Sequence, residues 1–329
     1  MSDLRIRDDQ LVHEATLPVL GVPVRLRSNE RGPIDVFERA YGYWRVLETH
    51  PELVAADRVE GRIVVESAAS VPQDARVPVK HRLLDRARML VSAPGCVGAC
   101  DAERRELAAW IEPALLADRD HFRYHVLEAL VLLVVTWLDR MPVHASAVVR
   151  DGTALLLTGP SGRGKSTLTY AAAGAGLRVL ADDMVFVQRA PLRVWGMPTF
   201  LHIPAESRAF FPELADVPVG LASSGKPKLA LDLRERGVAA PFPTAERLGI
   251  CVIERSNASA PSWRRLDAAS LGAVMGRPDP GFDRFADAYP RLTETLAARG
   301  GFALDAGRDP HAAARMLHEL IDAVEGAHP

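Results

Sequence analysis

The 329-residue chain has little cysteine, few aromatic side chains and no excess of charge of either sign. Its three cysteines, Cys96, Cys100 and Cys251, cannot build a disulfide framework. Cys96 and Cys100 have no second pair of ligands nearby, so buried or free thiols are favoured over a zinc site. The 40 basic and 42 acidic residues leave a formal net charge of -2, which gives no support for nucleic acid as a partner.

Long apolar stretches are also missing. The longest apolar run, Val126 to Leu138, is too short to cross a bilayer, and the N-terminus lacks the apolar core of a signal peptide. We therefore expect a cytoplasmic protein with no membrane partner. The content of 48% hydrophobic and 25% charged residues is typical of soluble globular proteins, and the length suggests two domains.

Two regions of different character divide the chain near residue 140. Residues 1–140 predict a small α+β region that ends in a buried linking helix. Within it, Arg62 to Glu66 and Ala87 to Val91 are predicted strands, and Asp101 to Asp139 is predicted to be mostly helical, with a break at Asp118 to Asp120. Residues 141–329 alternate short apolar runs with helical segments, which predicts an α/β domain.

A glycine-rich motif organises this second domain. Gly159 to Ser166 reads GPSGRGKS and matches G-x-x-x-x-G-K-[ST], the Walker A motif or P-loop, at each fixed position. A buried strand is predicted before it at Thr153 to Thr158, a helix after it at Ser166 to Ala173, and a second strand at Arg178 to Ala181. This order of strand, loop, helix and strand is the context that a phosphate-binding loop requires.

The residue types of the loop suit a nucleotide. Glycines let successive backbone N–H groups point at one anion, and the start of the following helix adds partial positive charge. We expect the Lys165 side chain to reach the β- and γ-phosphates and the Ser166 hydroxyl to hold Mg²⁺. Arg163 either lies over the phosphates or faces solvent. The predicted contacts to the nucleotide are Gly159, Pro160, Ser161, Gly162, Arg163, Gly164, Lys165, Ser166 and Thr167.

Two adjacent carboxylates, Asp182 and Asp183, follow the second strand directly. In open α/β sheets the carboxyl ends of the strands face the ligand, so one aspartate is predicted to face the Mg²⁺ on Ser166. The other is a candidate general base for a hydroxyl group. Neighbouring strand residues point in opposite directions, so both reach the site only if the chain turns there. The alternative is a pair of solvated loop acids.

Three more side chains are candidates for the same site. Lys226 and Lys228 precede a strand, and a basic loop there would supply positive charge over the phosphates, or else be an ordinary charged hairpin. His144 precedes a strand that is expected to pair near the P-loop strand. It either orients the acceptor or an aspartate, or is a satisfied core histidine.

The segments His144-Ala-Ser-Ala147, Gly159 to Ser166 and Leu180-Ala-Asp182-Asp183 together resemble the core of HPr kinase/phosphorylase proteins, over roughly residues 141–260. The resemblance implies an α/β P-loop kinase domain similar to phosphoenolpyruvate carboxykinase, and transfer of phosphate from ATP to a protein serine. It implies that Lys165 and Ser166 bind phosphate and Mg²⁺. It makes Asp182 the acid/base, Asp183 a metal or base partner, and His144 a lining residue.

The chain also departs from that family. The family's glutamate-containing segment appears here as Leu192 to Pro198 without the glutamate, and its arginine-bearing loop has no counterpart nearer than Lys226 and Lys228. Residues 1–140 do not resemble the regulatory domain of the family. The chain therefore looks closer to diverged HPr-kinase-like proteins, some of which are similar to kinases that modify ribosomal peptides.

These observations predict an ATP- and Mg²⁺-dependent kinase. Its acceptor is a hydroxyl group, serine foremost, of a peptide, a protein or a small molecule, and a homo-oligomer is compatible with the resemblance. The alternative is a nucleotide-binding regulatory ATPase that signals by conformation and transfers no phosphate. A kinase needs both a metal carboxylate and a base, whereas a switch needs only the former.

Overall fold

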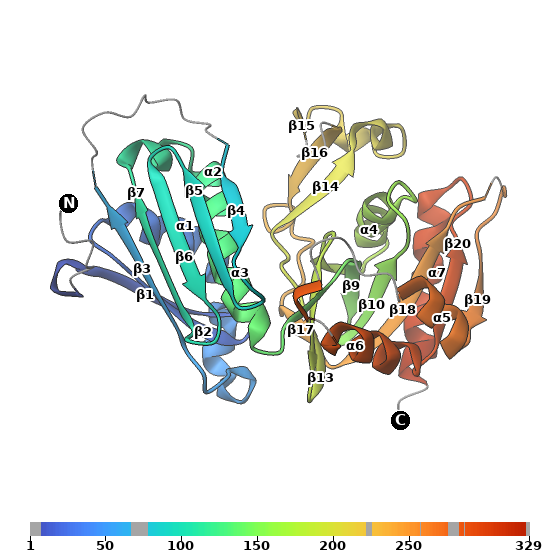
Figure 1. Ribbon diagram of the computed structural model, residues 1–329. Helices are drawn as coiled ribbons and strands as arrows, with labels where there is room; N and C mark the ends of the chain where they lie inside the picture. Colours follow the sequence, from blue (N-terminus) through green and yellow to red (C-terminus); the bar gives the residue numbers. More distant parts are fainter. Residues whose placement is uncertain are drawn as a thin grey trace. The chain divides into compact units, whose positions relative to one another are not determined.

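The computed structural model describes residues 8–66, 78–221, 226–256, 258–275, 283–285 and 287–326. The chain divides into two compact units, Met1–Arg140 and Met141–Pro329, each of which contains helices and sheets (Figure 1). The predicted α/β class is thus confirmed. Within the part of the chain that the structure describes, no helix combines the length and apolar character that crossing a bilayer demands.

Unit 1 is built on a seven-stranded mixed sheet in the order β1-β2-β3-β7-β6-β5-β4. Helix α1 packs on β1 and β2, and α3 packs on β5, β6 and β7 (Figure 1). The aromatic side chains of Phe37, Tyr41 and Trp44 are fully buried and form part of the core. The elements are β1 (His13–Val19), β2 (Val22–Ser28), α1 (Arg31–Tyr41), β3 (Val59–Val65), β4 (Lys80–Leu83), β5 (Arg88–Ala93), β6 (Cys96–Asp101), β7 (Glu106–Ile111), α2 (Arg119–Phe122) and α3 (Glu128–Trp137).

The predicted helix over Asp101 to Asp139 is wrong in its first part. Strand β7 lies there, as the second strand of an antiparallel hairpin with β6, and the connecting turn contains Arg105 in the left-handed region at φ 59°. In β7 every second side chain is buried, namely Leu107, Ala109 and Ile111. This is the period of a strand, whereas the alanines in the segment also fit a helix. Helical structure begins with a 3₁₀ helix at Pro113–Ala117, and α2 starts at Arg119, where the Asp118 side chain accepts a hydrogen bond from the His121 N–H at 3.0 Å.

Unit 2 is built on a six-stranded sheet in the order β11-β9-β10-β18-β20-β19. Strand β10 is parallel to β18, and β18 is parallel to β20. Strands β11 and β10 are both antiparallel to β9 and therefore run in the same direction. The carboxyl ends of β11, β10, β18 and β20 consequently lie at one edge of the sheet, where α/β proteins bind ligands. These strands are β9 (Ser146–Arg150), β10 (Thr153–Thr158), β11 (Arg178–Ala181), β18 (Arg247–Glu254), β19 (Ser262–Leu266) and β20 (Gly301–Asp305).

Both faces of this sheet are covered. In β10 the side chains of Leu155 and Leu157 join one core, with α4 and α7, and those of Ala154 and Leu156 join a second core, with α5 and α6 (Figure 1). A strand that is buried on both faces reads as a continuous apolar run, as TALLLT does. The covering helices are α4 (Lys165–Gly174), α5 (Ala268–Met275), α6 (Ala288–Ala297) and α7 (Pro310–Glu325).

Two small antiparallel sheets complete unit 2. One has the order β17-β13-β12-β8, and the other has the order β14-β16-β15. Lys228 lies on β16 and pairs with Pro204 of β14. The strands are β8 (Met141–Val143), β12 (Val185–Arg189), β13 (Leu192–Trp195), β14 (Phe200–Pro204), β15 (Val219–Leu221), β16 (Pro227–Asp232) and β17 (Thr244–Ala245).

The three cysteines of the chain are buried thiols, as the sequence predicts. Burial raises the pKa of the Cys96 thiol to about 11 and raises that of Cys251 further. A buried thiol with a raised pKa is a poor nucleophile and a poor metal ligand. The cysteines therefore contribute to packing, Cys96 and Cys100 in unit 1 and Cys251 in unit 2.

Gly196 provides a test of how tightly unit 2 is packed. A Cβ atom there would overlap the backbone carbonyl oxygen of Leu180 at the end of β11. We expect Gly196→Ala to lower the free energy of unfolding by about 1–3 kcal/mol. Gly174→Ala, at the end of α4 where nothing lies within 4 Å, is the matched control and should be neutral or stabilise by about 0.5–1 kcal/mol. Urea unfolding measures the free energy of unfolding of both variants. Equal midpoints would contradict the close contact between Gly196 and Leu180.

Candidate nucleotide site

The P-loop lies between β10 and α4 and has the backbone shape of a phosphate cradle. Gly159, Gly162 and Gly164 have φ values of 140°, 83° and 92°, in the region that favours glycine. A Cβ atom on Gly159 would lie 2.9 Å from the carbonyl oxygen of Ile253 on β18, so the adjacent strand leaves no room for a larger residue. Gly164 is the N-cap of α4, and the helix N-terminus therefore points its unpaired N–H groups at the loop.

Lys165 is buried inside this loop. Its side chain is held by a hydrogen bond from Nζ to the carbonyl oxygen of Gly159 at 2.8 Å. An ammonium group so placed, next to a helix N-terminus, makes the interior of the loop positive. An anion that enters the loop would meet both the N–H groups and this charge.

Asp182 follows β11 and is turned into the protein. Its carboxylate oxygen Oδ1 accepts a hydrogen bond from the Ser166 hydroxyl at 3.0 Å, and Oδ2 accepts one from the backbone N–H of His202 at 2.7 Å. Only 5% of the side chain is exposed. Both carboxylate oxygens are thus engaged, and one of them orients the hydroxyl that follows the P-loop lysine.

Asp183, the next residue, faces outward. Its backbone adopts the left-handed conformation at φ 64°, which turns the chain and separates its side chain from that of Asp182. The side chain is 67% exposed, and its Oδ1 lies 3.5 Å from Nε2 of His144. The chain therefore makes the turn that allows both adjacent aspartates to reach one site.

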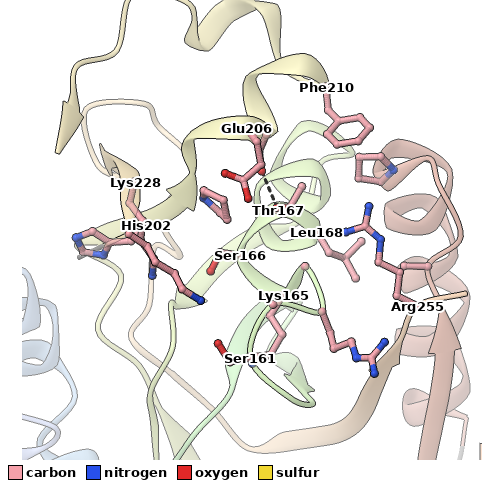
Figure 2. Close-up of a pocket in the computed structure, with 18 of the residues that line it drawn as sticks. Ser161, Lys165, Ser166, Thr167, Leu168, His202, Glu206, Phe210, Lys228 and Arg255 are labelled. Atoms are coloured by element: carbon pink, nitrogen blue, oxygen red, sulfur yellow. Dashed lines mark hydrogen bonds between the residues drawn. The ribbon is translucent and has the colours of Figure 1, made fainter. Parts of the chain in front are cut away.

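A cleft of about 340 Å³ opens beside the loop. Figure 2 shows His202 and Lys228 on one side of the P-loop, and Phe210, Leu168 and Arg255 on the other. The Thr167 hydroxyl is hydrogen-bonded to the Ser207 hydroxyl at 2.9 Å in its wall. The predicted residues that line this cleft are Ser161, Gly162, Arg163, Gly164, Lys165, Ser166, Thr167, Asp183, Lys226 and Lys228. The residues directly before Lys226 in the predicted basic loop, 222–225, lie outside the described residues.

A second cavity, of about 810 Å³, reaches the P-loop from the side of His144. Gly159, Pro160 and Arg163 line it together with the apolar side chains of Val252, Val274, Met275 and Tyr289. Since His144 lines this cavity and Asp183 lines the first cleft, the pair at 3.5 Å stands where the two spaces meet.

The electrostatic character of the first cleft is positive. Arg163, Lys226, Lys228, Arg255 and Arg308 line it, and none of them forms an ion pair with a described residue. Two carboxylates, Asp183 and Glu206, line it as well. Unpaired cations that converge on a loop of N–H groups favour a polyanion such as a triphosphate.

The residues also fit a magnesium ion. Among the described residues no group of three or more His, Cys, Asp or Glu side chains is arranged to hold a metal by itself. Mg²⁺ in nucleotide enzymes is held instead by one or two protein oxygens together with phosphate oxygens and water. The bonded pair of the Ser166 hydroxyl and the Asp182 carboxylate supplies such oxygens.

Several lining residues were missed from the sequence. Arg255 and Arg308 follow the parallel strands β18 and β20, and the rule that carboxyl strand ends face the ligand would have indicated them. His202, Glu206 and Phe210 come from β14 and the turn after it, outside the main sheet, and no local pattern marks them.

The fold and the site together define an α/β P-loop nucleotide-binding unit. A stretch of 145 residues, 43% of the chain, is 33% identical to the HPr kinase/phosphorylase of Lactobacillus delbrueckii subsp. bulgaricus and covers 45% of that protein. The resemblance predicted from the sequence is thereby confirmed. A stretch of 209 residues, 61% of the chain, is 28% identical to the tRNA modification GTPase MnmE of Rhizorhabdus wittichii and covers 43% of it.

The similarity to these curated relatives is partial, since the chain spans less than half the length of each. Among solved structures, the HPr(Ser) kinase/phosphatase from Coxiella burnetii aligns with a TM-score of 0.24 and 17% identity, over 48% of this chain and 93% of that chain. No family model matches the chain.

Proposed function

We propose that the chain is an ATP- and Mg²⁺-dependent kinase that transfers the γ-phosphate to a hydroxyl group, serine foremost, of a peptide, a protein or a small molecule. The observation that carries the proposal is the different environment of two adjacent carboxylates. Asp182 is buried against the P-loop serine, and Asp183 is exposed in the cleft beside His144. A kinase needs both kinds of carboxylate.

The geometry favours roles opposite to those that the family resemblance implies. Asp182 uses both oxygens in hydrogen bonds, at 3.0 and 2.7 Å, and its side chain is 5% exposed, so it does not face an acceptor. We therefore assign Asp182 to the metal side and Asp183 to the base. His144, at 3.5 Å from Asp183, orients that carboxylate.

Each residue then has one task. When bound beside Ser166 and Asp182, Mg²⁺ would neutralise charge on the β- and γ-phosphates. Asp183 takes the proton of the acceptor hydroxyl as its oxygen bonds to the γ-phosphorus. The bond from that phosphorus to the bridging oxygen breaks, and ADP leaves with the electron pair. Lys165 and the unpaired arginines of the cleft stabilise the charge that develops on the phosphates.

The acceptor has space of its own. His144 lines the second cavity, together with apolar side chains that include Val274 and Tyr289. An acceptor with an apolar group beside its hydroxyl fits this lining. The similarity to a protein named HPr kinase/phosphorylase supports a phosphotransfer reaction.

Transfer of labelled phosphate tests the proposal. The chain is incubated with γ-labelled ATP, Mg²⁺ and a lysate, and both labelled products and free phosphate are measured. A kinase labels an acceptor in amounts that rise with enzyme, and Asp183→Asn abolishes the label. Release of free phosphate without any labelled acceptor, unchanged in Asp183→Asn, would instead indicate the regulatory ATPase.

A further inference from the structure

One buried hydroxyl group on β9 contacts both aspartates of the site. Ser146, the first residue of β9, has no exposed surface. Its Oγ lies 3.5 Å from Oδ1 of Asp182 and 3.5 Å from the backbone nitrogen of Asp183. The geometry points to Ser146 as a positioning residue that holds the two carboxylates in their separate orientations. The inference rests on the proposed kinase function and adds to it a residue that lines neither the first cleft nor the second cavity.

Ser146 meets Asp182 because the pairing of β11 with β9 is irregular. The register of the two strands shifts by one residue at Leu180, and Ala181 then pairs with Ala147. In an antiparallel pair, the next residue of one strand lies opposite the preceding residue of the other. Asp182 therefore comes to lie opposite Ser146.

The shift also changes the face of the sheet on which the aspartate emerges. Side chains alternate between the two faces along a regular strand. Leu180 and Ala181, however, both join the core that contains α5 and α6, while Val179 joins the core on the α4 side. The alternation thus restarts one residue late, and Asp182 is carried to the α4 side, where it accepts from the Ser166 hydroxyl. Such bulges are frequent beside active sites, since they redirect a side chain.

The Ser146 hydroxyl serves both aspartates at once. A hydroxyl group has one O–H to donate and lone pairs with which to accept. Its O–H donates to Oδ1 of Asp182, and its oxygen accepts from the N–H of Asp183. Asp183 is the residue at φ 64°, a conformation that costs free energy for a non-glycine residue and persists where its surroundings hold it. Ser146 supplies one of the contacts that hold it.

The contact matters because the other hydroxyl on Asp182 has a second task. Oδ1 of Asp182 accepts from two hydroxyl groups, those of Ser166 and Ser146. In the proposed function the Ser166 hydroxyl also holds Mg²⁺, whereas Ser146 is buried in the sheet and has no such task. Ser146 therefore keeps the carboxylate oriented independently of the Ser166 hydroxyl.

Transfer from γ-labelled ATP to the acceptor in a lysate tests this role, as an initial rate at varied ATP and saturating Mg²⁺. Ser146→Ala should lower the maximal rate by about ten- to hundredfold, because it loosens the base. The ATP concentration that gives half-maximal rate should stay within about twofold, because the P-loop is untouched. Ser146→Thr keeps the hydroxyl group and should recover the rate to within about threefold.

Thr153→Ala is the matched control. It removes a buried hydroxyl group from β10, the strand next to β9, and this hydroxyl has no hydrogen-bond partner among the residues that the structure describes. The variant should change neither the maximal rate nor the ATP concentration for half-maximal rate.

A second measurement reports on the contact itself. Hydrogen exchange of the Asp183 N–H is followed by NMR in the chain without nucleotide. Exchange should be about tenfold faster or more in Ser146→Ala than in the wild type, because the N–H loses its acceptor. Ser146→Thr should restore slow exchange, and Thr153→Ala should leave it unaltered.

The outcomes separate this role from the function on which it rests. An unchanged maximal rate in folded Ser146→Ala overturns the role and leaves the kinase standing. Equal losses in Ser146→Ala and Thr153→Ala also overturn it, because both hydroxyl groups would then serve only the stability of the sheet. If the wild-type chain labels no acceptor, the proposed kinase fails and hydrogen exchange decides the role of Ser146. Unchanged exchange of the Asp183 N–H in Ser146→Ala then overturns the role, and faster exchange supports it.

Discussion

Lys165→Ala is expected to abolish nucleotide-dependent phosphate transfer, with a loss of about a thousandfold or more. The variant removes the one ammonium group that is buried inside the P-loop, where its charge is least screened by water. Binding of ATP should weaken as well, because the ammonium group faces the phosphates in both the ground state and the transition state. Transfer of labelled phosphate and calorimetric binding of ATP measure the two effects.

The control for this variant is Lys80→Ala, which removes an exposed lysine from β4 of unit 1. It should leave both transfer and binding within about twofold, since single exposed charges contribute little. Circular dichroism and urea unfolding serve to check that the Lys165→Ala variant is folded. Persistence of transfer in a folded Lys165→Ala chain would mean that the P-loop is not where the donor binds.

Asp183→Asn is expected to lower the rate of transfer by about 10²- to 10⁴-fold while ATP binding stays within a few-fold of the wild type. Asparagine keeps the size of the side chain and removes its ability to accept a proton. Since 67% of the Asp183 side chain faces solvent, the substitution should not disturb folding. Single-turnover transfer and ATP affinity are measured side by side.

Asp182→Asn gives the complementary result. It removes the negative charge beside the Ser166 hydroxyl and replaces one of the two acceptor oxygens with an NH₂ group, and it should therefore raise the Mg²⁺ concentration needed for half-maximal activity. If Asp182→Asn instead lost transfer with its Mg²⁺ requirement unchanged, and Asp183→Asn retained activity, the roles implied by the family resemblance would be restored.

The sequence predicts the centre of unit 2 well, because the signals there are local. The strands at Thr153–Thr158 and Arg178–Ala181 have the bounds predicted from their apolar runs, and the helix begins within a residue of the prediction. A P-loop is defined by consecutive residues whose backbone must take a fixed shape. The position of such a motif can be predicted from these residues alone, without knowledge of the rest of the chain.

Other parts of the fold depend on contacts that the sequence does not display. The sequence predicts helix where β7 lies because the alanines of that segment suit both structures, and burial against α3 decides between them. Phe210 and Glu206 reach the cleft from a turn after β14, which is placed by a small sheet of its own. Their position follows only from tertiary packing.

The two aspartates illustrate the same limit within the site. Their adjacency and their place after β11 are visible in the sequence, but the choice between them rests on a single left-handed residue, Asp183. Non-glycine residues adopt that conformation rarely, and no flanking pattern announces it. The backbone at one position therefore decides which carboxylate is buried and which is open.

One carboxylate also links two parts of unit 2 mechanically. Through its two oxygens Asp182 joins the first turn of α4 to strand β14, whose partner β16 carries Lys228. A displacement of the three-stranded sheet would rotate this carboxylate and alter the tilt of the hydroxyl beneath it. Coupling between two parts of a protein is reciprocal. A ligand that binds in the P-loop and fixes the Ser166 hydroxyl would therefore also restrict the position of the β14-β16-β15 sheet.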